Sequence, residues 1–152
     1  MTTTEATASS IESSVRPALT GIHHVGLTVT DVEASADWYQ RVLGLHREFD
    51  EPHHRSDQGG RAIVLCTPDM SVSVGLDHHP ANRGEGFDPT RTGLDHACFQ
   101  VASLDALQAW PNHLDAEGVH NSGVYAMEAM PISLVTFHDP DGIQLELIAF
   151  HA

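Results

Sequence analysis

An internal repeat constrains the fold of this chain more than any other feature of its sequence. The segment GIHHVGLTVTDVEASADW, which begins at Gly21, aligns with GLDHACFQVASLDALQAW, which begins at Gly93. The same offset places the segment TPDM on the segment DPDG. We therefore expect one domain over residues 20–152 that contains two copies of one unit. The expected parts are module 1 over about 20–79, a linker over about 80–92 and module 2 over about 93–152.

Each module is predicted to fold as βαβββ, because an alternating run is followed by helical periodicity and then by three short runs. Thr30 and Glu33 resemble a capping box for the first helix, which Gly44 should end, and Ser103 should cap the second helix. Pro111 lies too deep in the second helix to be a first-turn proline and predicts a kink or break. The predicted strands are 22–30, 46–51, 61–67, 71–77, 94–102, 120–126, 132–138 and 143–150.

Charge and hydropathy restrict the partners of the chain. Its 152 residues carry 21 acidic side chains against 7 basic ones, a net charge of −14 that argues against binding to nucleic acid or to an anionic membrane. No run approaches the roughly 20 apolar residues that cross a bilayer. A small molecule is the expected partner. The first 19 residues are predicted to be a disordered tail without a secretory signal, so a cytoplasmic location is expected, with Cys66 and Cys98 as buried free thiols.

Alternation along the strands predicts which side chains share a face. The apolar sets are Val25, Leu27 and Val29; Ala97, Phe99 and Val101; and Leu145, Leu147 and Ala149. His24, His96 and Glu146 take the opposite parity, so they can converge on the concave side if the modules form one curved sheet. Two imidazoles and a carboxylate form a facial triad that binds a divalent metal and leaves positions open for substrate or oxygen. Taken singly, each histidine is better interpreted as a hydrogen-bonded interior group, and Glu146 as a solvated strand residue.

At these residues the chain resembles the vicinal oxygen chelate (VOC) superfamily, which includes glyoxalase I, methylmalonyl-CoA epimerase, fosfomycin thiol transferases, extradiol dioxygenases and bleomycin-binding proteins. The segments that carry the resemblance are HVGLTVTDVEASADWYQRVLGL, GLDHACFQV and FHDPDGIQLELI. The resemblance implies an α+β fold, in which two βαβββ modules form a curved mixed β-sheet around a metal-binding cavity with the helices outside. It also implies that the metal ligands are His24, His96 and Glu146.

A fourth ligand of this superfamily comes from the last strand of the first module, where the chain departs from the pattern. The matching position is Gly75, or Val74 if the repeat offset is followed strictly. Neither residue has a side chain that can bind a metal ion. This departure counts against glyoxalase and epimerase reactions. The fosfomycin enzymes use a lysine, and this chain contains none. A three-ligand site resembles instead the iron dioxygenases.

The resemblance to extradiol dioxygenases implies further catalytic residues. A histidine precedes the middle ligand in those enzymes, and His78 and His79 lie at similar distances before His96, where a base could accept a catechol proton. The alternative is that both histidines lie in a solvated loop. The tyrosine of that family would fall on Thr136, so Tyr125 from a neighbouring strand is the substitute candidate. His53 and His54, expected in a loop over the cavity, have no assigned role.

The leading hypothesis is a metal-dependent enzyme that acts on a small molecule chelating the metal through adjacent oxygens. Fe²⁺ is the favoured ion, with Mn²⁺, Ni²⁺, Co²⁺ or Zn²⁺ as alternatives, and dioxygenase chemistry is the first candidate. A glyoxalase-like isomerase or lyase, with Glu128 as the spare carboxylate, is the second. A metal-free protein that binds an antibiotic or natural product and a metal-dependent thiol transferase are the others. A homodimer is expected.

Overall fold

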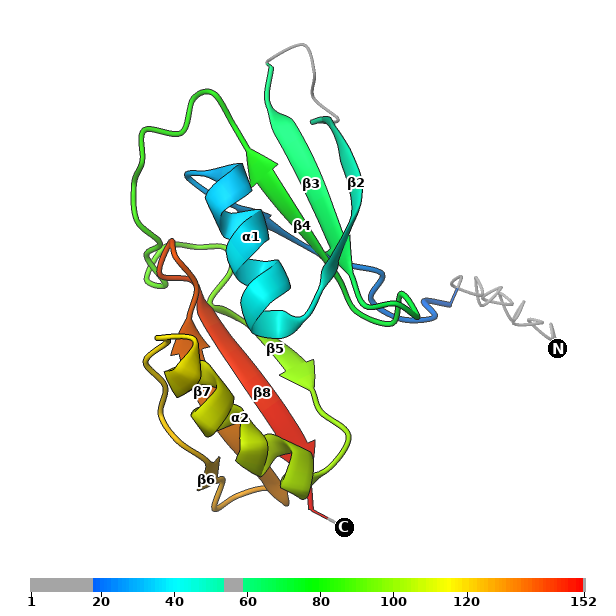
Figure 1. The fold of residues 1–152 in the computed structure, drawn as a ribbon, viewed down its shortest axis with the longest axis vertical. Helices are drawn as coiled ribbons and strands as arrows, with labels where there is room; N and C mark the ends of the chain where they lie inside the picture. Colours follow the sequence, from blue (N-terminus) through cyan, green and yellow to red (C-terminus); the bar gives the residue numbers. More distant parts are fainter. Residues whose placement is uncertain (1–17, 54–58, 152) are drawn as a thin grey trace, which may run out of the picture.

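The computed structural model describes residues 18–53 and 59–151, which fold as βαβββ twice in succession (Figure 1). The first set is β1 (Val25–Thr28), α1 (Val32–Leu43), β2 (His46–Pro52), β3 (Arg61–Cys66) and β4 (Ser73–His78). The second set is β5 (His96–Gln100), α2 (Leu104–Ala116), β6 (Tyr125–Ala126), β7 (Ile132–His138) and β8 (Gln144–Phe150). The predicted α+β architecture is confirmed. Most of the predicted tail, and His54, lie outside the described residues.

The strands form two four-stranded mixed sheets, with the orders β1-β4-β3-β2 and β5-β8-β7-β6. The first strand of each module pairs in parallel with the last one, and the remaining pairs are antiparallel. Figure 1 shows one sheet above the other, each crossed by its own helix. α1 packs on β3 and β4, and α2 packs on β7 and β8. The described strands do not close into a barrel.

Burial along the strands confirms the predicted alternation of faces. Leu27 in β1 and Ala97 in β5 are buried, as are alternate residues along β8. The apolar side chains of each strand thus form the core under the two helices. The opposite face of the sheet is not covered by a helix, and we call it the open face. On it His96 is exposed and Glu146 is only half-buried. Alternation fixed this arrangement, since a strand that buries one face must turn every second side chain away from it.

Both helices differ from the sequence prediction in one detail. α1 is capped by Asp31, whose carboxylate accepts from the N–H groups of Glu33 and Ala34, so the predicted capping box at Thr30 is wrong. Ser103 caps α2 as predicted, and the helix continues through Pro111 without a break. The packing of fully buried leucines on either side of Pro111 holds that helix together in spite of the lost hydrogen bond.

The predicted strand over 120–126 is reduced to the two residues of β6. The N–H of Gly123 donates to the side-chain oxygen of Asn121 over 2.9 Å, and Gly123 has a left-handed φ of 67°. This local turn occupies the start of the predicted strand, because an asparagine side chain that bonds the backbone two residues ahead competes with sheet pairing.

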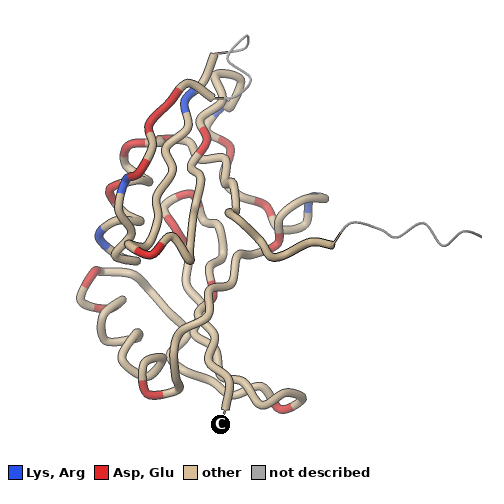
Figure 2. Tube along the Cα trace, turned by 90° about the vertical axis from the view of Figure 1, so that its right-hand side faces the viewer, with Lys and Arg blue, Asp and Glu red and all other residues tan. Residues whose placement is uncertain are grey.

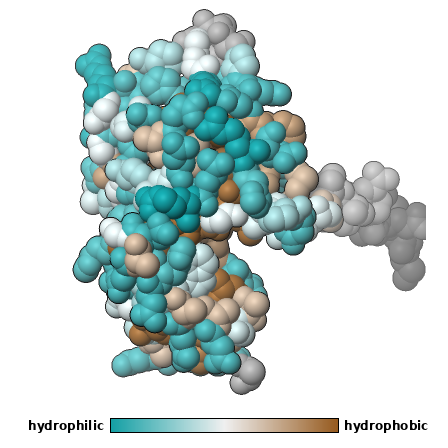
Figure 3. Space-filling model, viewed as in Figure 1, coloured by the Kyte–Doolittle hydropathy of each residue, from teal (hydrophilic) through white to brown (hydrophobic). Residues whose placement is uncertain are grey.

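The two modules are joined through α1 and the turn before β8. The Tyr39 hydroxyl donates to Asp139 over 2.9 Å in the buried interior, and the Trp38 ring lies 6.4 Å from that of Phe137. The backbone N–H of Thr30 donates to the Asp141 carboxylate. The space-filling view shows a waist between the modules with hydrophobic residues at its edge (Figure 3). These contacts fix the orientation in which the two sheets face one cavity.

The charges are unevenly distributed between the modules. No Lys or Arg follows Arg91 in the sequence, so module 2 has none, whereas acidic residues occur in both modules (Figure 2). In module 1, Arg61 pairs with Asp50 and Glu33, and Arg47 pairs with Glu33. No helix among residues 18–53 and 59–151 is long and apolar enough to cross a membrane.

Candidate metal centre

A cavity of about 500 Å³ lies where the two modules meet, at the start of β1, along β5 and beside the turn before β4. Residues of both modules line it. Its polar lining residues are His23, His24, Ser71, Ser73, His96, Cys98 and Gln100. Two of the three predicted metal ligands, His24 and His96, therefore line one cavity from different modules.

The third predicted ligand, Glu146, lies directly beside His96. Nε2 of His96 is 3.6 Å from Oε2 of Glu146, a separation compatible with two ligands of one ion. Nδ1 of His96 is 2.7 Å from a carboxylate oxygen of Asp95, and Gln144 donates to the other oxygen of Glu146 over 3.0 Å. Each group thus has one polar atom held by a neighbour, which leaves the other atom directed at a common point. This is the usual support of a metal-binding imidazole.

Electrostatics at His96 follow from the same contacts. The hydrogen bond to Asp95 raises the pKa of His96, burial lowers it, and the charge of Glu146 raises it again. His96 is 40% exposed, so the imidazole is accessible to solvent from the cavity. A histidine held between two carboxylates is suited to a cation in the cavity, whether that cation is a proton or a metal ion.

His24 is less well placed than the other two predicted ligands. It lies immediately before β1, and its Nδ1 is 2.9 Å from Nδ1 of His23, so one ring donates and the other accepts. In the described part of the chain, no three His, Cys, Asp or Glu side chains are gathered closely enough to hold a metal ion. The donor set suits a divalent ion. The His24 ring is engaged with His23 rather than with the other two predicted ligands.

Strand register identifies the position of the missing fourth donor. Gly26 pairs with Gly75 in module 1, and Cys98 pairs with Glu146 in module 2. Gly75 rather than Val74 is therefore the counterpart of Glu146. A Cβ atom at Gly75 would lie 3.8 Å from its nearest neighbours, which is ordinary contact, so the backbone there leaves room above the sheet.

Cys98 and Tyr125 lie close to Glu146. Cys98 is exposed on the open face, so the prediction of a buried thiol is wrong: its apolar neighbours in sequence belong to the opposite parity. Partial desolvation and the charge of Glu146 raise the pKa of Cys98 to about 11. Desolvation raises the pKa of Tyr125 as well, and the charges of Glu146 and Cys98 add to it. Both groups remain protonated near neutral pH and can donate hydrogen bonds.

The predicted catalytic pair His78 and His79 is placed differently. His78 ends β4 on the parity of buried Leu76, and the ring of His79 packs against that of His53 with 4.5 Å between centroids. Neither histidine is among the described residues that line the cavity. The structure brings His79 to His53, not to His96.

Sequence reasoning missed Asp77, which lies on the open face two residues after Gly75. His53 is 3% exposed, and its Nε2 is 3.4 Å from Oδ1 of Asp77. The strand parity of Asp77 was the available signal, because residues two apart on a strand share a face. The burial of His53 involves contacts with Gly60 and His79, which the local sequence pattern does not reveal.

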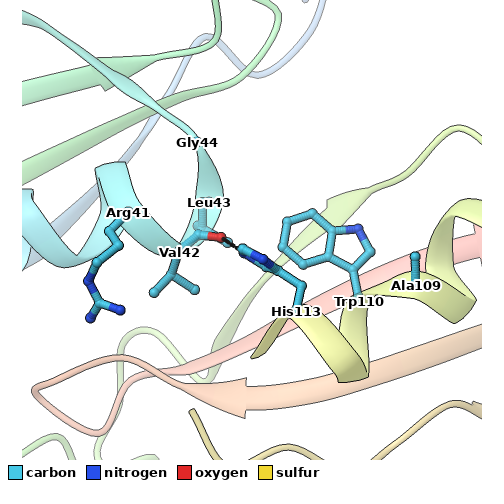
Figure 4. Close-up of a pocket in the computed structure, with 7 residues that line it drawn as sticks. All are labelled: Arg41, Val42, Leu43, Gly44, Ala109, Trp110 and His113. Atoms are coloured by element: carbon cyan, nitrogen blue, oxygen red, sulfur yellow. Dashed lines mark hydrogen bonds between the residues drawn. The ribbon is translucent and has the colours of Figure 1, made fainter. Parts of the chain in front are cut away.

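A second hollow, of about 310 Å³, lies between the end of α1 and α2 (Figure 4). Figure 4 shows Val42 and Leu43 on one side and Trp110 and His113 on the other. Nε2 of His113 donates to the carbonyl of Val42 over 2.8 Å, so the imidazole of this hollow is engaged in a contact between modules. Its apolar lining and this bond assign it to helix packing rather than to chemistry.

Comparison with known proteins agrees with this architecture. The profile of the glyoxalase/bleomycin resistance protein/dioxygenase superfamily matches residues 21–147. The chain belongs to this superfamily. A glyoxalase/bleomycin resistance protein/dioxygenase domain from Frankia sp. EAN1pec is similar to it in structure, with a TM-score of 0.77 and 28% identity over 88% of this chain and all of the other.

Two further proteins are similar to this chain. Ethylmalonyl-CoA/methylmalonyl-CoA epimerase of Cereibacter sphaeroides is 29% identical over 89 residues, which is 55% of this chain and 62% of the epimerase. The fosfomycin resistance protein FosX of Listeria monocytogenes, solved with Mn(II) and sulfate, has a TM-score of 0.61 at 14% identity over 87% of this chain and 93% of its own. At that identity FosX shows the shared fold alone.

Proposed function

We propose that this chain is a metal-dependent enzyme in which His24, His96 and Glu146 hold a divalent ion and a small substrate binds through two adjacent oxygens. The observation that carries the proposal is the 3.6 Å approach of His96 Nε2 to Glu146 Oε2, together with the cavity that His96 and His24 both line. Once bound, the ion would act as a Lewis acid that polarises the substrate oxygens.

The protein groups around this pair have separate tasks. Asp95 orients the His96 ring through Nδ1, and Gln144 orients the Glu146 carboxylate through Oε1. Tyr125 and Cys98, both protonated at neutral pH, are hydrogen-bond donors beside Glu146. Ser71 and Ser73 add hydroxyl groups to the cavity wall from module 1. A substrate with two oxygens would meet donors from both modules.

Proton-transfer chemistry, as in an isomerase or lyase, is the reaction that we favour. The support is the similarity to an epimerase. Glu128, the spare carboxylate considered from sequence, follows the short strand β6. Such a reaction needs a positioned base and no external oxidant.

Dioxygenase chemistry at Fe²⁺ is the second candidate. It is supported by the lack of a donor at Gly75, which leaves three protein ligands as in non-haem iron oxygenases. The proximity of Tyr125 to Glu146 supports it too. The location of His78 and His79 away from the cavity lining weakens it, because these residues were the proposed proton acceptors.

Metal binding tests the proposal directly. Untagged protein, purified without oxygen, is analysed for metal content and then titrated with Fe²⁺, Mn²⁺, Ni²⁺, Co²⁺ and Zn²⁺ by calorimetry. We expect one ion per chain, and a loss of affinity of more than about 100-fold in His96→Ala and Glu146→Gln, since removing even a supporting group costs 10–100-fold. The matched control is His46→Ala, an exposed histidine of β2.

The outcomes separate the alternatives. Iron, together with oxygen uptake on catechols, would favour the dioxygenase, whereas Ni²⁺, Co²⁺ or Zn²⁺ and activity without oxygen would favour the isomerase or lyase. A Glu146→Gln variant that binds metal as tightly as the parent would contradict the ligand assignment. No binding of any ion, with tight binding of an aromatic compound, would identify a metal-free binding protein instead.

A further inference from the structure

The open face of the module 2 sheet changes from polar to apolar along its strands. The residues that lie side by side on β5 and β8 are, in order, His96 with Gln144, Cys98 with Glu146, and Gln100 with Ile148. The first two pairs contain two of the candidate metal ligands. At the third pair the β8 side chain is apolar, so the polar series on β8 ends directly beyond Glu146.

The apolar character continues from Ile148 onto the neighbouring strands. Leu134 on β7 pairs with Ile148 on one side and with Tyr125 of β6 on the other. Ile132 pairs with Phe150, the last residue of β8. Because paired residues of neighbouring strands share a face, all of these side chains lie on the open face. We call Tyr125, Ile132, Leu134, Ile148 and Phe150 the apolar stripe.

Burial within the apolar stripe follows its position between the strands. Ile132 and Leu134 are 5% and 7% exposed, although no helix covers this face of the sheet. Tyr125 and Phe150 beside them are 40% and 58% exposed. An exposed group of large apolar side chains on an otherwise polar surface usually marks a binding site. The apolar stripe therefore presents two aromatic side chains to a ligand above a floor that is already buried.

The repeat shows that the fold does not require an apolar pair at this place. In module 1 the pair that corresponds to Gln100 and Ile148 is Thr28 with Asp77, and both of these side chains are polar. The same unit thus folds with a carboxylate where module 2 has an isoleucine. Packing of the βαβββ unit leaves this position free, so its apolar character in module 2 points to a ligand.

The size and place of the apolar stripe favour a small molecule as that ligand. Gln100 lines the cavity that contains His24 and His96, and it also pairs with Ile148, so the apolar stripe is continuous with the cavity. A stable contact between two proteins uses about 20–30 residues on each side, far more than the stripe contains. Small-molecule sites are typically apolar surfaces with a few polar groups at one place, which is the arrangement here.

Building on the proposed function, we propose that the substrate is an elongated molecule whose adjacent oxygens bind at His96 and Glu146 and whose aliphatic chain or aromatic ring lies on the apolar stripe. A strand rises by about 3.3 Å per residue, so Ile148 lies about 7 Å and Phe150 about 13 Å beyond Glu146 along β8. A substrate of two or three carbon atoms leaves the apolar stripe uncovered. The apolar stripe thus selects longer substrates over short ones with the same chelating group.

Alkyl hydroxamates test this length directly, because their two adjacent oxygens chelate a metal ion whatever the chain attached to them. Affinities of acetohydroxamate, butanohydroxamate, hexanohydroxamate and octanohydroxamate for the metal-loaded protein are measured by calorimetry. We expect the affinity to rise about threefold for each added methylene group, because each one leaves water for the apolar stripe. Octanohydroxamate should therefore bind at least about 100-fold more tightly than acetohydroxamate.

Substitutions at Phe150 test where the chain binds. Phe150→Ser should weaken octanohydroxamate by at least about 10-fold, since an apolar contact is lost, and should leave both metal content and acetohydroxamate affinity unchanged. Phe150→Leu keeps an apolar side chain and should retain most of the affinity. The control is Leu19→Ser, which removes an apolar side chain that is 97% exposed in module 1 and should change neither affinity.

The outcomes separate this inference from the proposed function. A parent protein that binds metal and acetohydroxamate but gains nothing from a longer chain overturns the inference alone. A Phe150→Ser variant that binds octanohydroxamate within threefold of the parent also overturns it. If that variant is in addition a smaller assembly than the parent in sedimentation, the apolar stripe is a contact between copies of the chain. A parent protein that binds neither metal nor acetohydroxamate overturns the proposed function and this inference together.

Discussion

The turns before β4 and β8 occupy equivalent positions in the repeat and have different surroundings. The first, Thr67–Met70, is exposed, and Asp69 accepts hydrogen bonds from its near neighbours Thr67 and Ser71. The second, Asp139–Gly142, is inserted against module 1, where Asp139 accepts from the buried Tyr39 hydroxyl. One turn stays local beside the cavity, and the other joins the modules.

This difference shows how a duplicated unit acquires a single site. The turn of module 2 holds the modules together. Burial raises the pKa of Asp139, although the hydrogen bonds that its carboxylate accepts lower it. The turn of module 1 leads into Ser71 and Ser73, which line the cavity. Turns at equivalent positions of the repeat thus join the modules in one copy and lead to the cavity in the other.

The largest expected effect is a difference between the two turns in their contribution to the free energy of unfolding. Asp139→Ala should lower the free energy of unfolding by about 3 kcal/mol, because it leaves the buried Tyr39 hydroxyl and the Ile143 N–H without an acceptor. Thr67→Ala, the equivalent change in module 1, should cost about 1 kcal/mol or less, since water can replace its bond to the Val72 N–H. Urea unfolding of both variants measures the difference. Equal losses would refute the assigned roles.

A smaller effect comes from the last residue of each turn. Met70 has a left-handed φ of 57°, where module 2 has Gly142 with a φ of 84°. Met70→Gly should raise stability by about 0.5–1 kcal/mol by relieving that conformation, and Gly142→Ala should lower it by a similar amount. Thermal unfolding monitored by circular dichroism gives both values. A destabilised Met70→Gly variant would mean that the exposed Met70 side chain makes contacts that outweigh the backbone strain.

The smallest expected effect is a pH dependence confined to the first turn. Hydrogen bonds from Thr67 and Ser71 lower the pKa of Asp69 from 3.8 to about 2. Because the folded-state pKa is depressed, ionised Asp69 adds stability above about pH 3.8, and this contribution is lost as the pH falls through about 2. The stability difference between parent and Asp69→Asn should therefore shrink between pH 5 and pH 2. A constant difference would contradict the prediction.

Several elements could be predicted because their signals are local. Alternation placed Leu27 and Ala97 in the core, and helix boundaries at Gly44 and Ser103 follow from backbone and capping chemistry. The break that Pro111 predicted is absent, because the cost of its lost hydrogen bond is a local quantity, whereas the burial that offsets it is not. Cys98 misled the prediction because apolar neighbours in sequence were taken as neighbours in space.

Some features of the candidate site could likewise be predicted from the sequence, and others depend on the fold. The parity of His24, His96 and Glu146 is a property of the sequence, and so is the absence of a donor at Gly75. The approach of His96 to Glu146, the pairing of His24 with His23 and the burial of His53 behind Asp77 are properties of the fold. Each depends on which strand lies beside which, or on the rotamer that a neighbour permits.

By itself the sequence determined a duplicated βαβββ unit and the face of each strand that is open, because a period of two and a repeat are readable along the chain. Only the tertiary structure decided that Asp139 of module 2 holds Tyr39 of module 1, and that Asp77 leans over Gly26 and Gly75. The physical reason is distance along the chain. Local propensity acts over a few residues, whereas these contacts join segments whose approach is fixed by the packing of the whole core.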